Sequence, residues 1–348
     1  MQSGGRIAWI DDARGIGIAL VVVGHVMRGL IAASILPDSP PVAFGDAWIY
    51  AFHMPLFFFL SGMFGPRNLD RPTRPFLQRE LRSIAYPYLV WSVLQAGIQI
   101  VLAGHTNHAA SVSDLLRIPW VPVMQFWFLY ALFLIVLFVH ALRRLGLSYP
   151  QVALVTLVLE VATRFVSLGS WGVLYEAVHN APYFAFGAAL GPALLSRAPT
   201  LRPGRAFAAA SLGFAALAAC IFAGLGPAGL VGYALASLGI ASALSLAIGL
   251  GRERWLEGIR TLGVHSLPIF VAHTLGSAFA RIALRALFGV ESAAVHLVAG
   301  VSAGLLLPVA LAVACERLGF RYAFTWPASS EVSGSRVREL GPGGAQRT

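Results

Sequence analysis

The sequence predicts an all-α, polytopic transmembrane helical bundle, and its composition and its apolar runs are the observations behind that prediction. Of the 348 residues, 57% are hydrophobic and 11% are charged, which is roughly half the charged fraction of a soluble domain. The mean hydropathy is +0.74. Apolar runs long enough to cross a bilayer as helices recur along the chain, whereas the short alternating segments of transmembrane strands do not.

About ten membrane-spanning helices are expected, and the arginines indicate their orientation. All 25 basic residues are arginine, and twenty of them lie in the terminal segments and in alternate loops. Because cytoplasmic loops carry the excess of basic residues, both termini are predicted to be cytoplasmic. The net charge of +10 therefore reflects membrane topology and not an affinity for nucleic acid. The predicted spans are residues 15–36, 48–65, 84–103, 124–140, 151–168, 172–191, 206–225, 228–250, 263–284 and 292–314.

The residue types exclude several kinds of chemistry. Because the sequence contains no lysine, Schiff-base catalysis and the phosphate-binding lysine of a P-loop are excluded. Cys220 and Cys315 lie in apolar segments, so neither a disulfide framework nor a zinc site is expected, and no metal is predicted. The first apolar run is long enough to span, begins beside acidic residues and lacks the cleavage site of a signal peptide.

The first predicted span contains a cation and an imidazole at a defined spacing. Ten apolar or small residues separate Arg14 from His25. A helix rises about 1.5 Å and turns about 100° per residue, so the two side chains lie on nearly the same face, about 16 Å apart. Arg14 is then expected at a water boundary and His25 near the middle of a hydrocarbon core about 30 Å thick. An ionisable side chain at that depth is costly, which makes His25 a candidate functional residue.

The second predicted span contains a histidine, a proline and two small residues in the segment FHMPLFFFLSGMFG. Pro55 is expected to kink the helix near His53. A membrane histidine is a functional candidate, although packing through a hydrogen bond is the commoner role. Ser61 and Gly62 indicate a close helix contact, and a covalent acyl intermediate on Ser61 is a lesser alternative.

The loop after the second span is the densest basic region, with five arginines over sixteen positions. Arginine binds phosphate through two parallel hydrogen bonds, so this loop is a candidate site for a diphosphate or a 3′-phosphorylated nucleotide. Topology and contact with anionic lipid are the simpler explanations of its charge. Arg79 and Arg82 are the stronger candidates, because they adjoin the third span.

Aromatic and polar side chains in later spans are candidates for the lining of a substrate cavity. Trp127 and Tyr130 lie at helix spacing near the outer edge of the fourth span, where an aromatic belt is the first interpretation and sugar stacking the second. Glu176 begins a polar stripe that enters the sixth span. His273 lies about mid-membrane in the ninth span, and the alternative is a packed histidine.

Several of these segments resemble the acyltransferase 3 family of integral-membrane O-acyltransferases. The first-span pattern of that family is an arginine and a histidine separated by ten residues, as Arg14 and His25 are here. FHMPLFFFLSG resembles the second-span signature, and RSIAYPYLVW, FWFLYALF, PYFAFGAAL and LGVHSLPIFVAH resemble later segments. The chain departs from the family in the segment IDDARG. There the aspartate is followed by DAR, whereas lysine-glycine is common at that point in the family. The resemblance covers residues 6–317, the expected membrane domain, and residues 327–348 are expected to form a disordered cytoplasmic tail.

The resemblance implies transfer of an acyl group, usually acetyl, from cytoplasmic acyl-CoA to a hydroxyl in the bacterial inner membrane. The acceptor implied is an extracytoplasmic or lipid-linked glycan or a similar molecule. His25 is then expected to be the general base, because imidazole titrates near neutrality and such a base accelerates transfer by about 10²–10⁴-fold. Arg14 and His53 are the other candidate catalytic residues. The candidates for binding the donor are Arg14, Arg79, Arg82 and Ser61. The candidates for lining the substrate cavity are Trp127, Tyr130, Glu176 and His273.

Two other classes of membrane protein are the alternatives. A transporter of a sugar, a polyol or an acyl compound would also have many spans with buried histidines. It is expected to show related halves with interrupted helices, and no such internal similarity is visible in the sequence. A glycosyltransferase that uses lipid-linked sugars is expected to have an acidic pair on the outer side, whereas Asp38, Asp46 and Asp114 are isolated.

Overall fold

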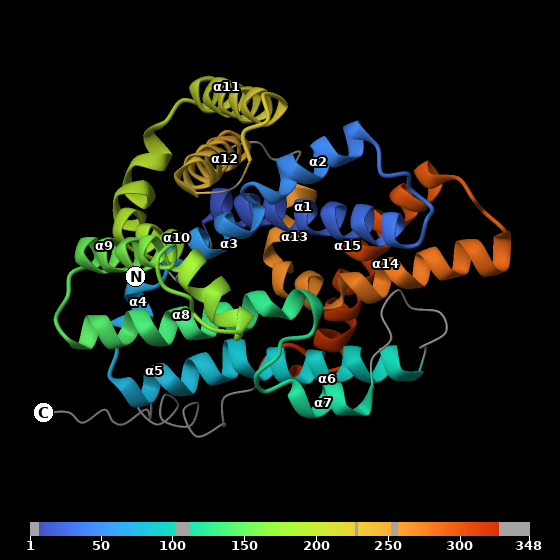
Figure 1. The fold of residues 1–348 in the computed structure, drawn as a ribbon, viewed down its shortest axis with the longest axis horizontal. Coiled ribbons are helices and arrows are strands. Elements are labelled where there is room, and N and C mark those ends of the chain that lie inside the picture. The colour runs from blue at the N-terminus through green and yellow to red at the C-terminus, as the bar shows by residue number, and fades with distance from the viewer. Residues whose placement is uncertain (1–6, 102–110, 227–228, 252–256, 327–348) are drawn as a thin grey trace, which may run out of the picture.

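The computed structural model describes residues 7–101, 111–226, 229–251 and 257–326, which form helices and turns without a strand (Figure 1). The predicted tail, residues 327–348, lies outside the described residues. The α-helices are α1 (Ala8–Ala32), α2 (Pro40–Tyr50), α3 (His53–Met63), α4 (Pro66–Leu69), α5 (Thr73–Glu80), α6 (Tyr86–Val101), α7 (Val112–Arg117), α8 (Trp127–Arg144), α9 (Tyr149–Ala162), α10 (Gly172–Arg197), α11 (Pro203–Phe222), α12 (Gly229–Leu250), α13 (Glu257–Val264), α14 (Ser266–Phe288) and α15 (Ala293–Arg317). A π-helical segment, η1 (Leu81–Ala85), joins α5 to α6, and single 3₁₀ turns are η2 (Met124–Phe126), η3 (Ala198–Thr200) and η5 (Arg321–Ala323).

Eight helical units of the described chain are long and apolar enough to cross a membrane, which confirms the predicted all-α membrane fold. They are Ala8–Ala32, Pro40–Met63, Thr73–Val101, Met124–Arg144, Pro203–Phe222, Gly229–Leu250, Ser266–Phe288 and Ala293–Arg317. The remaining two predicted spans are helical as well. However, α9 has only 14 residues, fewer than the roughly 20 of a straight crossing, and the continuous helix α10 contains Glu176 and other polar residues. Ten crossings and cytoplasmic termini remain predictions.

The second span is interrupted where Pro55 is found. Helix α2 ends at Tyr50 and α3 begins at His53. Proline has no N–H to donate, and its ring clashes with the carbonyl four residues earlier, which here belongs to Ala51. The predicted kink near His53 is confirmed. The close helix contact predicted at Gly62 is confirmed as well, because a Cβ there would overlap the carbonyl of Phe184 in α10.

Helix α1 lies in the middle of the bundle in Figure 1 and packs against α3, α12, α13, α14 and α15. Its approach to α13 requires a glycine, because a Cβ at Gly263 would overlap the backbone carbonyl of Asp11. Arg260 of α13 donates hydrogen bonds of 3.2 and 3.0 Å to the two carboxylate oxygens of buried Asp12. These hydrogen bonds raise the pKa of Arg260 further above its usual range. The ion pair and the glycine contact together hold α1 in register with α13.

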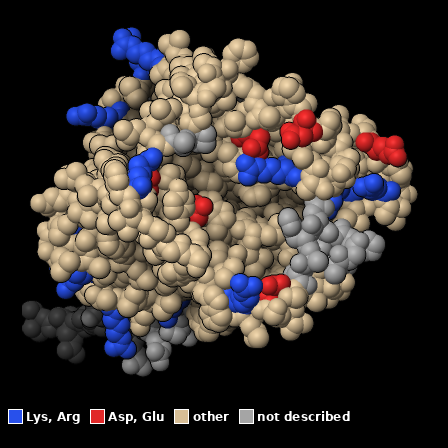
Figure 2. All heavy atoms as spheres, viewed as in Figure 1, with Lys and Arg blue, Asp and Glu red and all other residues tan. Residues whose placement is uncertain are grey.

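The scarcity of charge on the surface agrees with a membrane environment, and a hollow in the surface shows where the bundle is open. On the face drawn in Figure 2, charged side chains are few, and most of the surface is uncharged. The same face is hollowed to the right of its centre, where Figure 1 shows α6 below α1 and α14.

Candidate functional site

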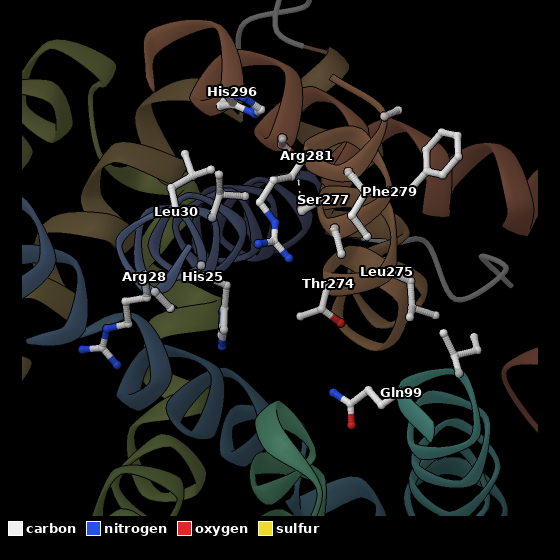
Figure 3. A pocket seen from close by; sticks show the side chains of 18 of the residues that line it. His25, Arg28, Leu30, Gln99, Thr274, Leu275, Ser277, Phe279, Arg281 and His296 are labelled. Carbon is white, nitrogen blue, oxygen red and sulfur yellow. Dashed lines mark hydrogen bonds between the residues drawn. The ribbon is translucent and has the colours of Figure 1, made fainter. Parts of the chain in front are cut away.

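A cavity of about 640 Å³ lies between α1, α6, α14 and α15, and we call it the His25 cavity. Most of its lining is apolar. The polar side chains in the lining are His25, Arg28, Gln95, Gln99, Thr274, Ser277, Arg281 and His296. In Figure 3, His25 extends from α1 into the open space, and Thr274 and Gln99 approach the same space from α14 and α6. The cavity therefore offers a few hydrogen-bonding groups on an otherwise apolar wall.

Three histidines from three different helices meet beside this cavity. The ring centroids of His25 and His273 lie 5.0 Å apart. The ring of Tyr50 lies 6.5 Å from that of His25 and 4.5 Å from that of His53. His53 and His273 are 1% and 0% exposed, whereas His25 lies on the cavity wall. The structure thus brings together three residues that sequence reasoning selected from separate spans.

The same tautomer is favoured in all three imidazoles. In each of them, Nδ1 lies 2.8 to 3.0 Å from the backbone carbonyl oxygen four residues earlier. A ring nitrogen that faces a carbonyl carries the proton, so Nε2 holds the lone pair of the neutral ring. The Nε2 atoms of His53 and His273 are buried and have no hydrogen-bond partner among the described residues. Nε2 of His25 is the one of the three that borders the cavity, and it is therefore the atom suited to accept a proton.

A cation holds the aromatic ring that lies between His25 and His53. Arg28 donates hydrogen bonds of 2.7 and 2.8 Å to the two carboxylate oxygens of Asp46. Its guanidinium lies over the ring of Tyr50, 3.2 Å from the centroid. Sequence reasoning missed this group, although Arg28 follows His25 by three residues and therefore lies on the same helix face.

A buried amide network forms part of the cavity wall and was also missed. Gln125 donates hydrogen bonds of 2.9 Å to Gln95 and 3.1 Å to Thr274, and the Thr274 hydroxyl lies 3.1 Å from the Gln95 side-chain oxygen. Both glutamines are buried. Met124, which precedes Gln125, has a φ of 44°, in the left-handed region of backbone conformation. Glutamines inside apolar spans are costly, and this was the sequence signal that could have identified them.

A second cavity, of about 860 Å³, lies near the other end of α1, and we call it the Arg14 cavity. Its polar side chains are Asp11, Arg14, Ser61, Arg67, Asn68, Arg79, Glu80, Ser83 and Ser266. Arg14 lies 3.6 Å from Asp11 and faces the ring of Phe64 at 5.4 Å. Three arginines line this cavity against two carboxylates, those of Asp11 and Glu80, so the excess of positive charge suits an anionic ligand.

The two cavities lie at different levels of α1. Arg14 lines one and His25 lines the other, about 16 Å apart along the helix. Between them, Ile18, Val21 and Val22 are each 0% exposed. One buried helix therefore presents a cation to one cavity and an imidazole to the other. The spacing in the sequence predicted their separation along the helix, but not that they line two different cavities.

A smaller pocket of about 290 Å³ adjoins the Arg14 cavity, with which it shares Arg79 and Ser83. Arg82, also predicted for the donor, lines this pocket and not the Arg14 cavity. One wall is Thr325, which belongs to residues 320–326 after α15, here called the C-terminal strap. The backbone of the strap accepts hydrogen bonds of 2.8 Å from the side chains of Tyr86 and Trp91. The strap is thereby attached next to η1, the π-helical segment that carries Arg82.

The four residues predicted for the substrate cavity line neither large cavity. His273 is fully buried beside His25, and the other three lie farther away. Trp127 packs its ring against neighbouring phenylalanines. Tyr130 donates a hydrogen bond of 2.7 Å to the carbonyl of Pro119. The Glu176 carboxylate lies 3.5 Å from the Asn180 amide. The assignment of these four residues to a substrate cavity remains a prediction, and the lining of the two cavities does not support it.

Comparison with known proteins identifies the family. No solved structure matches the chain significantly. The inner membrane protein YcfT of Escherichia coli (strain K12) is 28% identical over 208 residues, which cover 54% of this chain and 57% of that protein. The match thus spans little more than half the length of this relative. The family model described as an acyltransferase domain (Acyl_transf_3) matches residues 7–314. Because this model covers most of the chain, the chain belongs to the acyltransferase 3 family, and eight of its described helical units are long and apolar enough to cross a membrane.

Proposed function

We propose that this protein transfers an acyl group, most often acetyl, from cytoplasmic acyl-CoA to a hydroxyl of an extracytoplasmic or lipid-linked glycan, with His25 as the general base. The observation that carries the proposal is the position of Arg14 and His25 at two levels of one buried helix, each lining its own cavity. If the donor is an anion from the cytoplasm and the acceptor comes from the outer side, each needs its own cavity that leads to the reactive centre.

The Arg14 cavity suits the donor. Coenzyme A carries a diphosphate and a 3′-phosphate, and the planar guanidinium of arginine binds phosphate oxygens in pairs. Arg14, Arg67 and Arg79 line the cavity, and Arg79 continues into the pocket that also holds Arg82. In this assignment Arg14 binds or orients the donor, and the arginines near η1 hold its phosphates.

The His25 cavity suits the acceptor. Its hydroxyl would donate a hydrogen bond to Nε2 of His25. The hydroxyl oxygen attacks the carbonyl carbon of the thioester while Nε2 takes the hydroxyl proton. The carbon–sulfur bond then breaks, the leaving thiolate takes the proton back from the imidazolium, and an ester and free coenzyme A result. Proton transfer by a positioned base contributes about 10²–10⁴-fold to such a reaction.

The neighbouring rings would orient the base. His273 lies edge to face against His25, and Tyr50 lies between His25 and His53. The rings of His273 and Tyr50 limit the rotation of His25, and His53 acts on it through Tyr50. Because His273 and His53 favour the same tautomer as His25, they do not compete for its cavity-facing nitrogen. In this account His53 and His273 are positioning residues.

The test is a stoichiometric assay in membranes that contain the protein. Membranes are supplied with acetyl-CoA labelled in the acetyl group, and released thiol and label in the glycan and lipid-linked fractions are measured. The proposal predicts equal amounts of thiol and ester, both absent from membranes without the protein. A transporter would instead move a sugar, a polyol or an acyl compound across sealed vesicles without acyl-CoA, and that result without thiol release would contradict the proposal.

A further inference from the structure

Three phenylalanines form a layer at one end of the Arg14 cavity. Phe57 of α3, Phe128 of α8 and Phe270 of α14 all line that cavity. The ring centroids of Phe57 and Phe128 lie 6.0 Å apart and those of Phe128 and Phe270 lie 5.3 Å apart, both edge to face. Aromatic rings in this arrangement attract one another beyond their burial. We call this group the phenylalanine layer.

The order of residues along the helices shows which end of the cavity the layer lines. On α3, Phe57 is the lining residue nearest to His53 in sequence, and on α14, Phe270 is the one nearest to His273. On α8, Phe128 is the lining residue nearest to the helix start, the end that the amide network ties to α14. The layer therefore lines the end of the Arg14 cavity that faces the histidines.

The layer lies next to the candidate base. The ring centroid of Phe270 is 6.4 Å from that of His273, which lies 5.0 Å from that of His25. A thioester that enters the Arg14 cavity would meet the phenylalanine rings before it met an imidazole. The acyl group, as the terminal part of the donor, would be the part that reaches the layer.

We propose that the phenylalanine layer limits the length of the acyl group that this protein transfers, so that short acyl groups such as acetyl are selected. This inference rests on the proposed function of the Arg14 cavity as the donor site. Phe128 and Phe270 are buried and packed against each other, and forcing further methylene groups into a packed interior is unfavourable. Each additional methylene on the acyl group therefore has to displace a ring.

Phe57 is the best residue for a test, because it is the half-buried member of the layer. Phe57→Leu and Phe57→Ala enlarge the space at the layer in two steps. Phe58→Leu is the matched control. Phe58 is the next residue in α3 and also contacts Phe128, with centroids 4.7 Å apart, but it does not line the Arg14 cavity. Phe270→Leu tests the layer from a second helix if the Phe57 variants are poorly expressed.

The experiment measures kcat/KM for acetyl-, propionyl-, butyryl- and hexanoyl-CoA by thiol release, with the membrane acceptor present. Wild-type protein is expected to lose about tenfold in kcat/KM for each methylene added, the usual discrimination of an apolar pocket. Phe57→Ala is expected to raise the hexanoyl to acetyl ratio by at least about tenfold, Phe57→Leu by less, and Phe58→Leu not at all. Inhibition by free coenzyme A should be unchanged in all variants, because its phosphates bind elsewhere.

Two other results have separate meanings. Equal rates with acetyl- and hexanoyl-CoA in the wild type, or an unchanged ratio in both Phe57 and Phe270 variants that transfer acetyl, would overturn the role of the layer and leave the donor site intact. Absence of transfer from every acyl-CoA would overturn the proposed function and this inference with it.

Discussion

Replacing Gly263 with alanine is expected to force α1 and α13 apart and so to reduce both stability and activity. A Cβ at this position would overlap the carbonyl oxygen of Asp11, and the next atoms it meets are also backbone atoms, of Asp11 and Gly15. No side-chain rotation can relieve such an overlap. Gly258 lies on the same helix, and a Cβ there would have no described atom within 4 Å, so Gly258→Ala is the matched control.

The expected magnitude follows from this geometry. Non-bonded atoms pack at roughly 3.5 Å, so the two backbones have to separate by more than about 1 Å. Overpacking of this kind typically costs about 1–3 kcal/mol. Both alanines bring the same gain of up to about 1 kcal/mol in helix propensity. The free energies of unfolding of the two variants should therefore differ by about 1–3 kcal/mol, with Gly263→Ala the less stable.

Activity should fall as well, because α1 carries both Arg14 and His25. A displacement of about 1 Å at a reacting group costs about 10²-fold in rate. Thermal unfolding in detergent and acetyl transfer in membranes at matched expression measure the two effects. Equal unfolding temperatures and equal transfer rates for Gly263→Ala and Gly258→Ala would show that α1 and α13 do not approach as closely as described.

Three further predictions concern the walls of the cavities. Thr274→Val removes one hydroxyl from the amide network and should destabilise the protein by about 1–3 kcal/mol and raise KM for the acceptor; a variant unchanged in both measurements would contradict a structural role of the network. Ser61→Ala should transfer acetyl within about threefold of wild type, and a denaturation-stable acyl label on the wild-type protein that this variant lacks would establish the covalent route instead. The double variant Tyr86→Phe, Trp91→Phe removes two hydrogen bonds to the C-terminal strap, each worth about 0.5–1.5 kcal/mol. It should raise KM for acyl-CoA without changing KM for the acceptor, and an unchanged KM for acyl-CoA would exclude the strap from the donor site.

The features that the sequence predicted correctly depend on near neighbours in the chain. Apolar run length indicates a membrane helix without reference to the rest of the protein, so the all-α fold could be predicted. The break before His53 follows from the clash of Pro55 with its own preceding turn. The spacing of Arg14 and His25 is a property of one helix, and it placed the two residues at different levels of α1 before any packing was known.

The features that could not be predicted depend on the rotation and contact of distant helices. Asp12 and Arg260 are 248 positions apart in sequence, and no local pattern pairs them. The contact between His25 and His273 requires α1 and α14 to turn these faces toward each other. Trp127, Tyr130 and Glu176 were assigned to a cavity from their residue type and depth alone. These properties do not fix the rotation of α8 and α10, which directs the three side chains to other contacts.

The most direct test of the account compares acetyl transfer by His25→Gln with transfer by His265→Gln. The two histidines share one local geometry, because Nδ1 of His265 also lies 2.9 Å from the carbonyl four residues earlier, that of Thr261, yet His265 lines neither cavity. At matched expression, His25→Gln is expected to lose about 10²–10⁴-fold in transfer rate while retaining inhibition by free coenzyme A, and His265→Gln is expected to remain near wild type. Transfer by His25→Gln at the wild-type rate would contradict the assignment of His25 as the base.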